Sequence, residues 1–348
     1  MNHAFNLETI LLFIFVFILT ICLNFLFKLS NFCLDNLEHS KHKTFAVSEK
    51  IPLSLGFILI IFSLFFFHGD LNSIIFFISI FVLGLFSDLN LLNNAYKKFF
   101  FQFLIILIFI ISTELVISET RINIIDNLLK FSFLSYFFTT FCLMILINGK
   151  NFIDGMNGLV IINSLLIFII LIFAADNYNL KLDNKLYLNF IYILSIILFF
   201  NLLGKSFLGD SGSFLIGAII GYLVITFHND NLAVSPFFIL VLLWYPAYEI
   251  LFSIIRKIKQ NKSPFKPDNF HLHQLLFLSF NKKFKNKKYS NNLTSITINF
   301  FNFILYFSSL YFIYSTIKLF YLISIYSIIY IFIYNYFYRS HNSLNFEK

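Results

Sequence analysis

The chain has 348 residues, of which 59% are hydrophobic and 12% are charged, and its mean hydropathy is +0.83. A water-soluble domain carries about 25% charged residues, so this composition excludes a soluble globular enzyme and indicates a protein of the lipid bilayer. The net charge of +8 does not indicate nucleic-acid binding, because Lys and Arg of membrane proteins are retained on the cytoplasmic side. The three cysteines have no CxxC spacing and support neither a disulfide framework nor a zinc site.

Eleven apolar runs are long enough, or nearly so, to cross an apolar layer about 30 Å thick. They cover residues 7–27, 51–67, 71–87, 99–117, 131–147, 159–175, 186–203, 214–227, 234–255, 293–317 and 319–337. Only Lys318 separates the last two, so ten spans are the close alternative. The first run is too long for a signal-peptide core and has no basic residue before it. The sequence therefore predicts an all-α, polytopic membrane protein with a retained first helix and one domain over residues 1–348.

The distribution of basic residues predicts the orientation. With the N-terminus outside, 20 of the 25 Lys and Arg residues fall in cytoplasmic segments, in agreement with the positive-inside rule. Ten of them lie in one basic cytoplasmic loop, residues 256–292. The others include Lys41, Lys43, Lys97, Lys98, Lys150 and Lys205. The C-terminus is predicted to be cytoplasmic as well.

Three of the predicted cytoplasmic loops contain small acidic motifs. They are Ser87-Asp88-Leu89, the segment NGKNFIDGMNG at 148–158, and Gly209-Asp210-Ser211-Gly212-Ser213. Helices that begin near Leu159 and Phe214 direct their N-terminal N–H groups and positive dipole ends at this face, where they attract phosphate. A carboxylate beside an anionic ligand is favourable when a divalent cation lies between them.

A single Asp-Gly or Asn-Gly pair between helices is usually an ordinary turn. Here, however, Asp88, Asp154 and Asp210 all reach one face under a topology derived from Lys and Arg alone. Unrelated turns are not expected to do this, so the motifs together indicate a site for Mg²⁺ and a diphosphate.

The basic loop also carries His271 and His273. Two histidines at this spacing can converge on one ligand from an extended segment, whereas on a helix their side chains lie about 200° apart. The local backbone therefore decides whether both rings can reach the same ligand. They suit phosphate binding or proton transfer better than zinc, and the alternative is a solvated loop that touches anionic lipid. Glu249 lies seven residues before Arg256, about 10 Å inside the membrane boundary along a helix. A carboxylate there is costly unless it is paired.

The motifs FSDL, NGKNFIDGMNGL, FLGDSGS and HLHQ, in this order and at these intervals, resemble those of the polyprenyl-phosphate N-acetylhexosamine-1-phosphate transferases, a bacterial membrane family. The resemblance covers roughly residues 51–276, and the His-x-His element is similar to that of the O-antigen and common-antigen initiators. It implies transfer of a HexNAc-1-phosphate from a UDP-sugar to undecaprenyl phosphate, with Mg²⁺ and release of UMP. It also implies a bacterial inner membrane, a cytoplasmic active site and a possible homodimer.

The resemblance implies a role for each matching residue. Asp210 would bind Mg²⁺, and Asp88 would contact the metal or deprotonate or position the lipid phosphate. Asp154 and Asn151 would form the donor site, and His271 and His273 would engage phosphates. The further candidates for substrate binding are Asn148, Asn157, Asn201, Ser211, Lys97 and Glu249.

The chain departs from the family pattern at several positions. Ser87 stands where members carry the first of two acids, Asn157 and Glu249 each replace an Asp, and the interval from Asn201 to Asp210 is one residue shorter. The lost acid favours altered donor preference or reduced activity, so a catalytically degenerate relative is one alternative. A transporter is another, but its polar residues would lie near the bilayer midplane, often with repeat symmetry, and no repeat is evident here.

Overall fold

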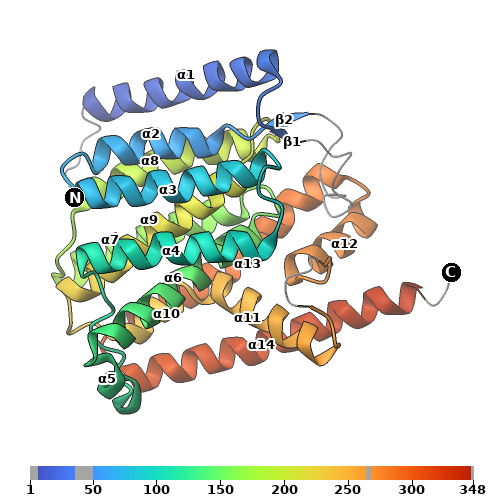
Figure 1. The fold of residues 1–348 in the computed structure, drawn as a ribbon. Helices are drawn as coiled ribbons and strands as arrows, with labels where there is room; N and C mark the ends of the chain where they lie inside the picture. Colours follow the sequence, from blue (N-terminus) through green and yellow to red (C-terminus); the bar gives the residue numbers. More distant parts are fainter. Residues whose placement is uncertain (1–6, 36–49, 264–267, 346–348) are drawn as a thin grey trace.

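The computed structural model describes residues 7–35, 50–263 and 268–345, and this part of the chain is almost entirely helical (Figure 1). Two short strands, β1 and β2, pair antiparallel, with Leu34 opposite Pro52. The elements are α1 (Leu7–Ser30), β1 (Leu34–Asp35), β2 (Ile51–Pro52), α2 (Leu55–Phe66), α3 (Leu71–Asp88), α4 (Ala95–Thr113), α5 (Asn123–Leu129), α6 (Ser132–Ile153), α7 (Leu159–Tyr178), α8 (Asn184–Leu202), α9 (Gly209–Asp230), α10 (Pro236–Leu242), α11 (Trp244–Lys259), α12 (Leu272–Phe284), α13 (Lys287–Leu310) and α14 (Thr316–Asn345).

Short polar side chains directly before the apolar runs determine where several helices begin. Asp70 and Asn94 accept hydrogen bonds from backbone N–H groups in the first turns of α3 and α4. Asp183, Ser235 and Asn286 do the same for α8, α10 and α13. Such caps satisfy N–H groups that have no partner within the helix. Local sequence therefore sets these starts.

Nine of the described helices are long and apolar enough to cross a membrane, and α10 with α11, which meet at 75°, makes a tenth if the pair is one span. Each of the eleven predicted runs coincides with a helix or with this pair. The chain is therefore an all-α polytopic membrane protein. The count of eleven is not confirmed, because α2 has 12 residues and a helix of that length reaches only about 18 Å.

Three predicted boundaries are wrong. The chain leaves the helix at residues 311–315, and Lys318 lies in the first turn of α14 rather than at the break. Helix α9 begins at Gly209 instead of near Phe214, and α6 continues to Ile153 instead of ending near residue 147. Hydropathy detects only the apolar part of a span, whereas these helices continue through polar residues that find partners on neighbouring helices.

Helix α9 lies at the centre of the bundle. In its spanning window 89% of the residues are buried, compared with 17% for α1 and 11% for α14, which lie at the two outer edges in Figure 1. It packs against α2, α3 and α6. Glycines permit this close approach, because a Cβ on Gly84 would lie 2.4 Å from the Cα of Ser211 and one on Gly56 would lie 2.8 Å from the nitrogen of Gly212.

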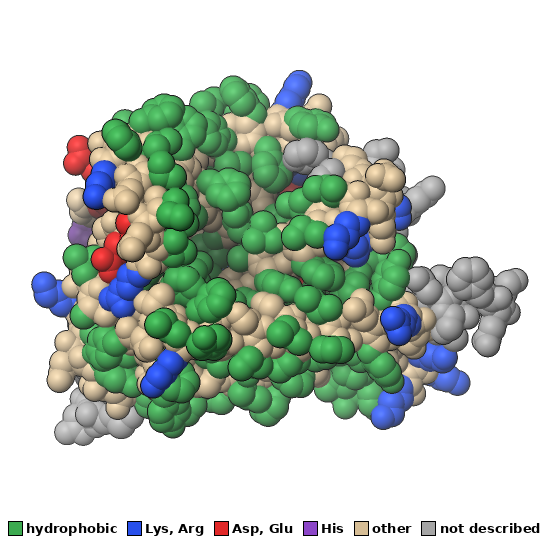
Figure 2. Space-filling model, turned by 90° about the horizontal axis from the view of Figure 1, so that it is seen from below, with side chains coloured by type: hydrophobic (Ala, Val, Ile, Leu, Met, Phe, Trp, Pro, Cys, Tyr) green, Lys and Arg blue, Asp and Glu red, His purple; other side chains and the backbone are tan. Residues whose placement is uncertain are grey.

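The ends of α3, α6 and α8 and the starts of α4, α7 and α9 meet at one end of the bundle, which we call the site end. The short strands and α12 lie at the same end (Figure 1). Figure 2 shows one long face of the molecule, where hydrophobic side chains cover most of the surface between the two ends. Lys41, Lys43, Lys266 and Lys348, which enter the orientation count, lie outside the described residues. The orientation and the single domain stay predictions.

Candidate active site

Asp88, the last residue of α3, caps the N-terminus of α9. Its two carboxylate oxygens accept hydrogen bonds from the backbone nitrogens of Asp210 (2.7 Å) and Ser211 (3.0 Å). Gly209 makes this contact possible, since its φ is +70° and a Cβ there would lie 2.7 Å from Asp88 Oδ2. The carboxylate thus satisfies two N–H groups that have no partner within the helix and lies at the positive end of the helix dipole.

The side chain of Asp210 connects three other helices. One carboxylate oxygen accepts a hydrogen bond from Asn151 Nδ2 on α6 (2.9 Å). The other accepts from the Ser87 hydroxyl and lies 3.3 Å from Lys98 Nζ, which also donates to Ser87. Asn151 Nδ2 additionally donates to the hydroxyl of Ser213 (2.9 Å). We call these five residues the Asp210 cluster; the Asp210 side chain is 33% exposed and therefore accessible to a ligand.

Three members of the Asp210 cluster, Ser87, Lys98 and Ser213, are missing from the predicted site residues. The sequence predicts Lys97 instead, but Lys97 is exposed, and its neighbour Lys98 makes the contacts. Adjacent side chains on a helix point about 100° apart. Because Asn94 fixes where α4 begins, the start of the helix is the signal that distinguishes Lys98 from Lys97. Ser87, interpreted from the sequence as a lost acid, bridges Lys98 and Asp210 through its hydroxyl.

A second polar cluster surrounds Glu249, whose side chain is 1% exposed on α11. Its Oε1 accepts hydrogen bonds from His271 Nδ1 and from the backbone nitrogen of Leu272, both at 3.1 Å. Its Oε2 accepts from the hydroxyl of Tyr330 on α14 (2.7 Å). The pairing that a carboxylate at this depth requires is therefore present.

Asp268 completes this cluster on the side toward water. It accepts two hydrogen bonds from the guanidinium of Arg256 (2.7 and 3.1 Å) and lies 3.4 Å from His271 Nε2. Burial alone would raise the pKa of Asp268, but the hydrogen bonds from Arg256, together with the electrostatic effect of His271, Arg256 and Lys257, outweigh it, so this pKa lies below its usual value. Both ring nitrogens of His271 therefore face carboxylates of its own chain.

The two histidines lie side by side. His271 has an extended backbone (φ −79°, ψ 150°) and caps α12, whereas His273 lies in the first turn of that helix. Their rings stack with centroids 5.5 Å apart and planes 11° from parallel. The change from extended to helical backbone between the two residues brings the rings together, which a helix running through both residues would not do.

Residues 151–155 connect the two clusters. Asn151 donates to Asp210, and Phe152 packs edge-on against His271 with ring centroids 5.2 Å apart. Gly155 faces His273, because a Cβ there would lie 3.1 Å from its Nε2. Asp154 lies in this segment and is half-buried. The end of α6 therefore brings the predicted donor residues between the carboxylates and the histidines.

Four other predicted substrate-binding residues are held within the fold. Asn148 is buried and donates to Gln102 Oε1 (2.6 Å). Asn201 is buried and joins the α6–α7 turn to the α8–α9 connection through two backbone groups. The backbone nitrogen of Asn157 donates to a side chain at the start of α13, and Ser211 is fully buried against α3. The structure places Asn148, Asn201 and Ser211 inside the bundle rather than on its accessible end.

Lys150 is completely buried, although the predicted orientation counts it as a loop residue. Its Nζ donates to Asn163 Oδ1 (2.6 Å) and Ser164 Oγ (3.1 Å) on α7. The Asn163 amide in turn donates to the hydroxyl of Tyr306 on α13 (2.9 Å). Lys150 thus connects three helices and contributes no surface charge, which removes one residue from the count of basic residues exposed at this end.

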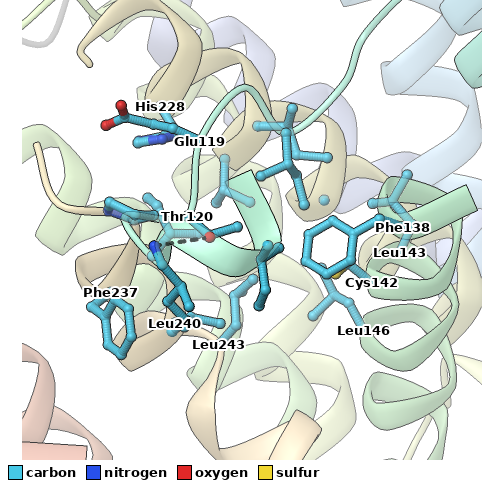
Figure 3. A pocket seen from close by; sticks show the side chains of 18 residues that line it. Glu119, Thr120, Phe138, Cys142, Leu143, Leu146, His228, Phe237, Leu240 and Leu243 are labelled. Carbon is cyan, nitrogen blue, oxygen red and sulfur yellow. Dashed lines mark hydrogen bonds between the residues drawn. The ribbon is translucent and has the colours of Figure 1, made fainter. Parts of the chain in front are cut away.

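A cavity of about 220 Å³ lies near the opposite end of the bundle. Residues of α6, α9 and α10 line it, and Figure 3 shows Glu119 and His228 together on one side and Phe138, Leu143 and Leu146 on the other. His228 is eighteen residues after Asp210 on α9, which corresponds to about 27 Å along a helix. This apolar cavity is therefore separate from the Asp210 cluster.

Known proteins resemble the part of the chain that carries these clusters. Residues 71–228 match the model of glycosyl transferase family 4. An undecaprenyl-phosphate alpha-N-acetylglucosaminyl 1-phosphate transferase of Thermotoga maritima is 41% identical over 71 residues, which is 20% of this chain and 23% of the relative. The Escherichia coli K12 protein of the same name is 32% identical over 152 residues, 40% of each chain. Residues 71–228 belong to glycosyl transferase family 4.

A decaprenyl-phosphate N-acetylglucosaminephosphotransferase of Mycobacterium leprae is also similar, at 28% identity over 152 residues and 38% of each chain. These alignments span between 23% and 40% of the relatives' lengths. The family 4 segment begins with α3 and ends in α9. It therefore contains the whole Asp210 cluster, whereas Glu249 and the two histidines lie after it.

The polar groups of the Asp210 cluster are of a kind that could hold a magnesium ion bound by few protein ligands. Mg²⁺ prefers oxygen ligands and is usually bound through one or two carboxylates together with waters and phosphates. Asp210 supplies a partly exposed carboxylate beside a hydroxyl and an amide. In the described part of the chain no group of three or more His, Cys, Asp or Glu residues could enclose a metal. Asp210 is the residue that could hold such an ion, because its side chain is 33% exposed. Both oxygens of Asp88 accept hydrogen bonds from backbone N–H groups at the start of α9.

Replacing Glu249 with Gln is expected to destabilise the protein. The amide nitrogen of Gln cannot accept a hydrogen bond, so at least one of the three donors around this residue loses its acceptor inside the bundle. An unsatisfied buried polar group costs about 1–3 kcal/mol, and chemical denaturation in detergent would measure this decrease in the free energy of unfolding. Tyr330→Phe, which leaves Glu249 Oε2 without its donor, should also lower the free energy of unfolding. A Glu249→Gln variant as stable as the native chain would contradict the network.

Acid is expected to destabilise the protein through His273. Burial lowers the pKa of this ring from 6.5 to about 3, so the folded state keeps it neutral while the unfolded state protonates it below pH 6.5. Stability should therefore fall as the pH decreases from about 6.5 toward 3, by about 2 kcal/mol at pH 5. His273→Phe should lose less stability between pH 7 and pH 5 than the native chain in the same denaturation assay. Equal losses would show that this histidine is not buried in the neutral form.

Proposed function

We propose that the protein transfers a HexNAc-1-phosphate from a UDP-sugar to a polyprenyl phosphate such as undecaprenyl phosphate and releases UMP. The observation that carries this proposal is the Asp210 cluster at the N-terminus of α9. There a partly exposed carboxylate, a lysine, an amide and two hydroxyls gather at one end of a membrane bundle. The similarity of residues 71–228 to glycosyl transferase family 4, and the names of the relatives, support the same activity.

In the proposed reaction an oxygen of the lipid phosphate attacks the β-phosphorus of the UDP-sugar. The bond from this phosphorus to the bridging oxygen breaks, and UMP leaves with that oxygen. Such a transfer depends mainly on positioning and charge neutralisation. Mg²⁺, when bound at Asp210, would supply part of that neutralisation. Lys98 supplies a further positive charge 3.3 Å from Asp210, and Asn151 supplies an amide.

Asp88 is proposed as a positioning residue rather than as a base. Its oxygens hold the first N–H groups of α9, and a phosphate monoester with a second pKa near 6 is already mostly ionised at neutral pH. Asp154 is proposed to line the donor site, because it is half-buried and lies three residues after Asn151. His273 is 1% exposed and lies against Gly155, so it is proposed to support this segment from inside the fold rather than to contact the phosphates as the sequence predicts. His271 is proposed to orient His273, since both of its ring nitrogens face carboxylates.

The proposed setting is the inner membrane of a bacterium, with the site end in the cytoplasm. The excess of Lys and Arg in the predicted cytoplasmic segments supports this orientation. One substrate is then water-soluble and the other is held in the bilayer, so a site at the membrane boundary is where they meet. The product would be the first lipid-linked intermediate of a surface glycan such as O-antigen.

The test uses the purified full chain with undecaprenyl phosphate, Mg²⁺ and a panel of UDP-HexNAc donors, with and without EDTA. The proposal predicts metal-dependent release of UMP and a lipid product whose mass identifies the donor. A folded preparation that gives no product with any donor would overturn it and favour a degenerate relative. Uptake of a donor sugar into proteoliposomes without UMP release would favour a transporter instead.

A further inference from the structure

An exposed basic turn lies between α12 and α13. Five lysines occur within the seven residues 282–288, and all five are exposed, namely Lys282, Lys283, Lys285, Lys287 and Lys288. The sequence contains no Asp or Glu between Asp268 and Glu347. Among the described residues no ion pair joins these lysines to an acid. The charge that balances them must therefore come from outside this part of the chain.

The same turn exposes two aromatic side chains. Phe284 is 40% and Tyr289 is 52% exposed, and their rings pack edge-on with centroids 5.1 Å apart. Lys283 Nζ lies 5.4 Å from the centre of the Phe284 ring. Aromatic and basic side chains occur together at the boundary between membrane and water, where rings reach the apolar layer and charges reach headgroups.

The backbone holds this turn in one conformation. Lys285 ends α12 with a positive φ of 52°, and Asn286 caps α13 by accepting a hydrogen bond from the Tyr289 nitrogen (3.0 Å). Two residues of the second turn of α13 attach the helix to its neighbours, since Asn291 accepts from the Asn157 nitrogen (2.7 Å) and Asn292 donates to the Leu202 carbonyl (3.1 Å). The basic turn therefore lies at the site end.

Helix α13 is one of the helices long and apolar enough to cross a membrane, and it begins at Lys287. The basic turn is thus directly next to a span, at the depth of the headgroups. Clusters of four to eight basic residues at this position attract anionic lipids.

From the uncompensated charge, the exposed rings and the position beside a span, we propose that the basic turn binds the headgroups of anionic phospholipids in the leaflet at the site end. The site is formed by the five lysines with Phe284 and Tyr289. It is separate from the Asp210 cluster and does not depend on the proposed transferase activity. A soluble phosphate compound offers the same chemistry as a headgroup, and the test below distinguishes the two sources.

The test places a tryptophan in the basic turn. The full-length Tyr289→Trp variant is reconstituted in nanodiscs that contain anionic and zwitterionic phospholipids, with bromine on the chains of one or the other. Bromine quenches tryptophan at short range, so the ratio of quenching at equal mole fraction measures the local lipid composition. The native chain, whose single Trp244 is 8% exposed, supplies the background. We expect at least about twofold more quenching by the anionic lipid, with a decrease as salt is added.

Two charge variants, one at each end of the bundle, assign the effect to the turn. Replacing the five lysines with Gln should remove the preference for anionic lipid. Replacing Lys130, Lys181 and Lys185, which are exposed at the opposite end, should leave it unchanged. Equal quenching by the two lipids, or a preference that survives loss of the five lysines, would overturn the proposal. Reversal by inorganic phosphate, beyond the effect of chloride at the same ionic strength, would also overturn it and assign the turn to a soluble phosphate.

Discussion

Replacing Asp210 with alanine is expected to reduce the proposed transfer at least about a thousandfold. The variant removes the one partly exposed carboxylate of the Asp210 cluster, and with it the acceptor for Ser87, Lys98 and Asn151. Loss of a group that neutralises charge during phosphoryl transfer acts mainly on kcat. Release of UMP at saturating donor, measured over a range of Mg²⁺ concentrations, reports this change.

The control for this variant lies on the same helix. Asp230 is the last residue of α9 and is exposed at the opposite end of the bundle, so Asp230→Ala should retain nearly full activity. Full Mg²⁺-dependent turnover by Asp210→Ala would exclude Asp210 from the reaction. Equal losses in both variants would mean that the effect comes from α9 as a whole rather than from the cluster.

Gly84→Ala is expected to separate α3 from α9. The added Cβ would lie 2.4 Å from the Cα of Ser211 and 2.7 Å from the carbonyl oxygen of Asp210. These are backbone atoms and cannot move aside as a flexible side chain can, so the helices must shift. Overpacking of this kind costs about 1–3 kcal/mol. A displacement of about 1 Å at a reacting centre can lower activity about a hundredfold.

The measurement compares the free energy of unfolding in detergent and the turnover of this variant with those of Gly69→Ala. A Cβ on Gly69 has nothing within 4 Å, so the control should match the native chain in both assays. If Gly84→Ala keeps native stability and turnover, α3 and α9 are not packed as closely at this point as the structure shows.

The spans and the end of the bundle that carries the motifs could be predicted because hydropathy and charge are properties of short segments. Helix α7 begins at Leu159 as expected, and Asp88 and Asp210 do meet. The ends of α6 and α9 could not be predicted, since Asn151 and Asp210 are polar and their helical conformation depends on partners in other helices. Lys150 illustrates the same limit, because only the packing of α6, α7 and α13 shows that its charge is buried.

The members of the site were harder to predict than its location. The motifs contain Asp210 and Asn151. Lys98 lies outside every motif, and only the direction in which it points from α4 and its contact with Asp210 show that it belongs to the site. Ser87 looked like a loss because only its missing charge is visible in the sequence, whereas its hydroxyl has two partners. The partnership of Glu249 with Tyr330 joins residues 81 positions apart, and no local pattern encodes it.

The central position of α9 has a consequence for how the protein matures in the membrane. The groups around Asp210 come from α3, α4 and α6, and α9 is the last of the four to be synthesised. The histidines follow later still, and Tyr330, which holds their carboxylate partner, is on the final helix. A chain that is only partly inserted therefore has no assembled centre. Under the proposed function it would spend no nucleotide sugar and leave no lipid half-converted until its last helices are in place.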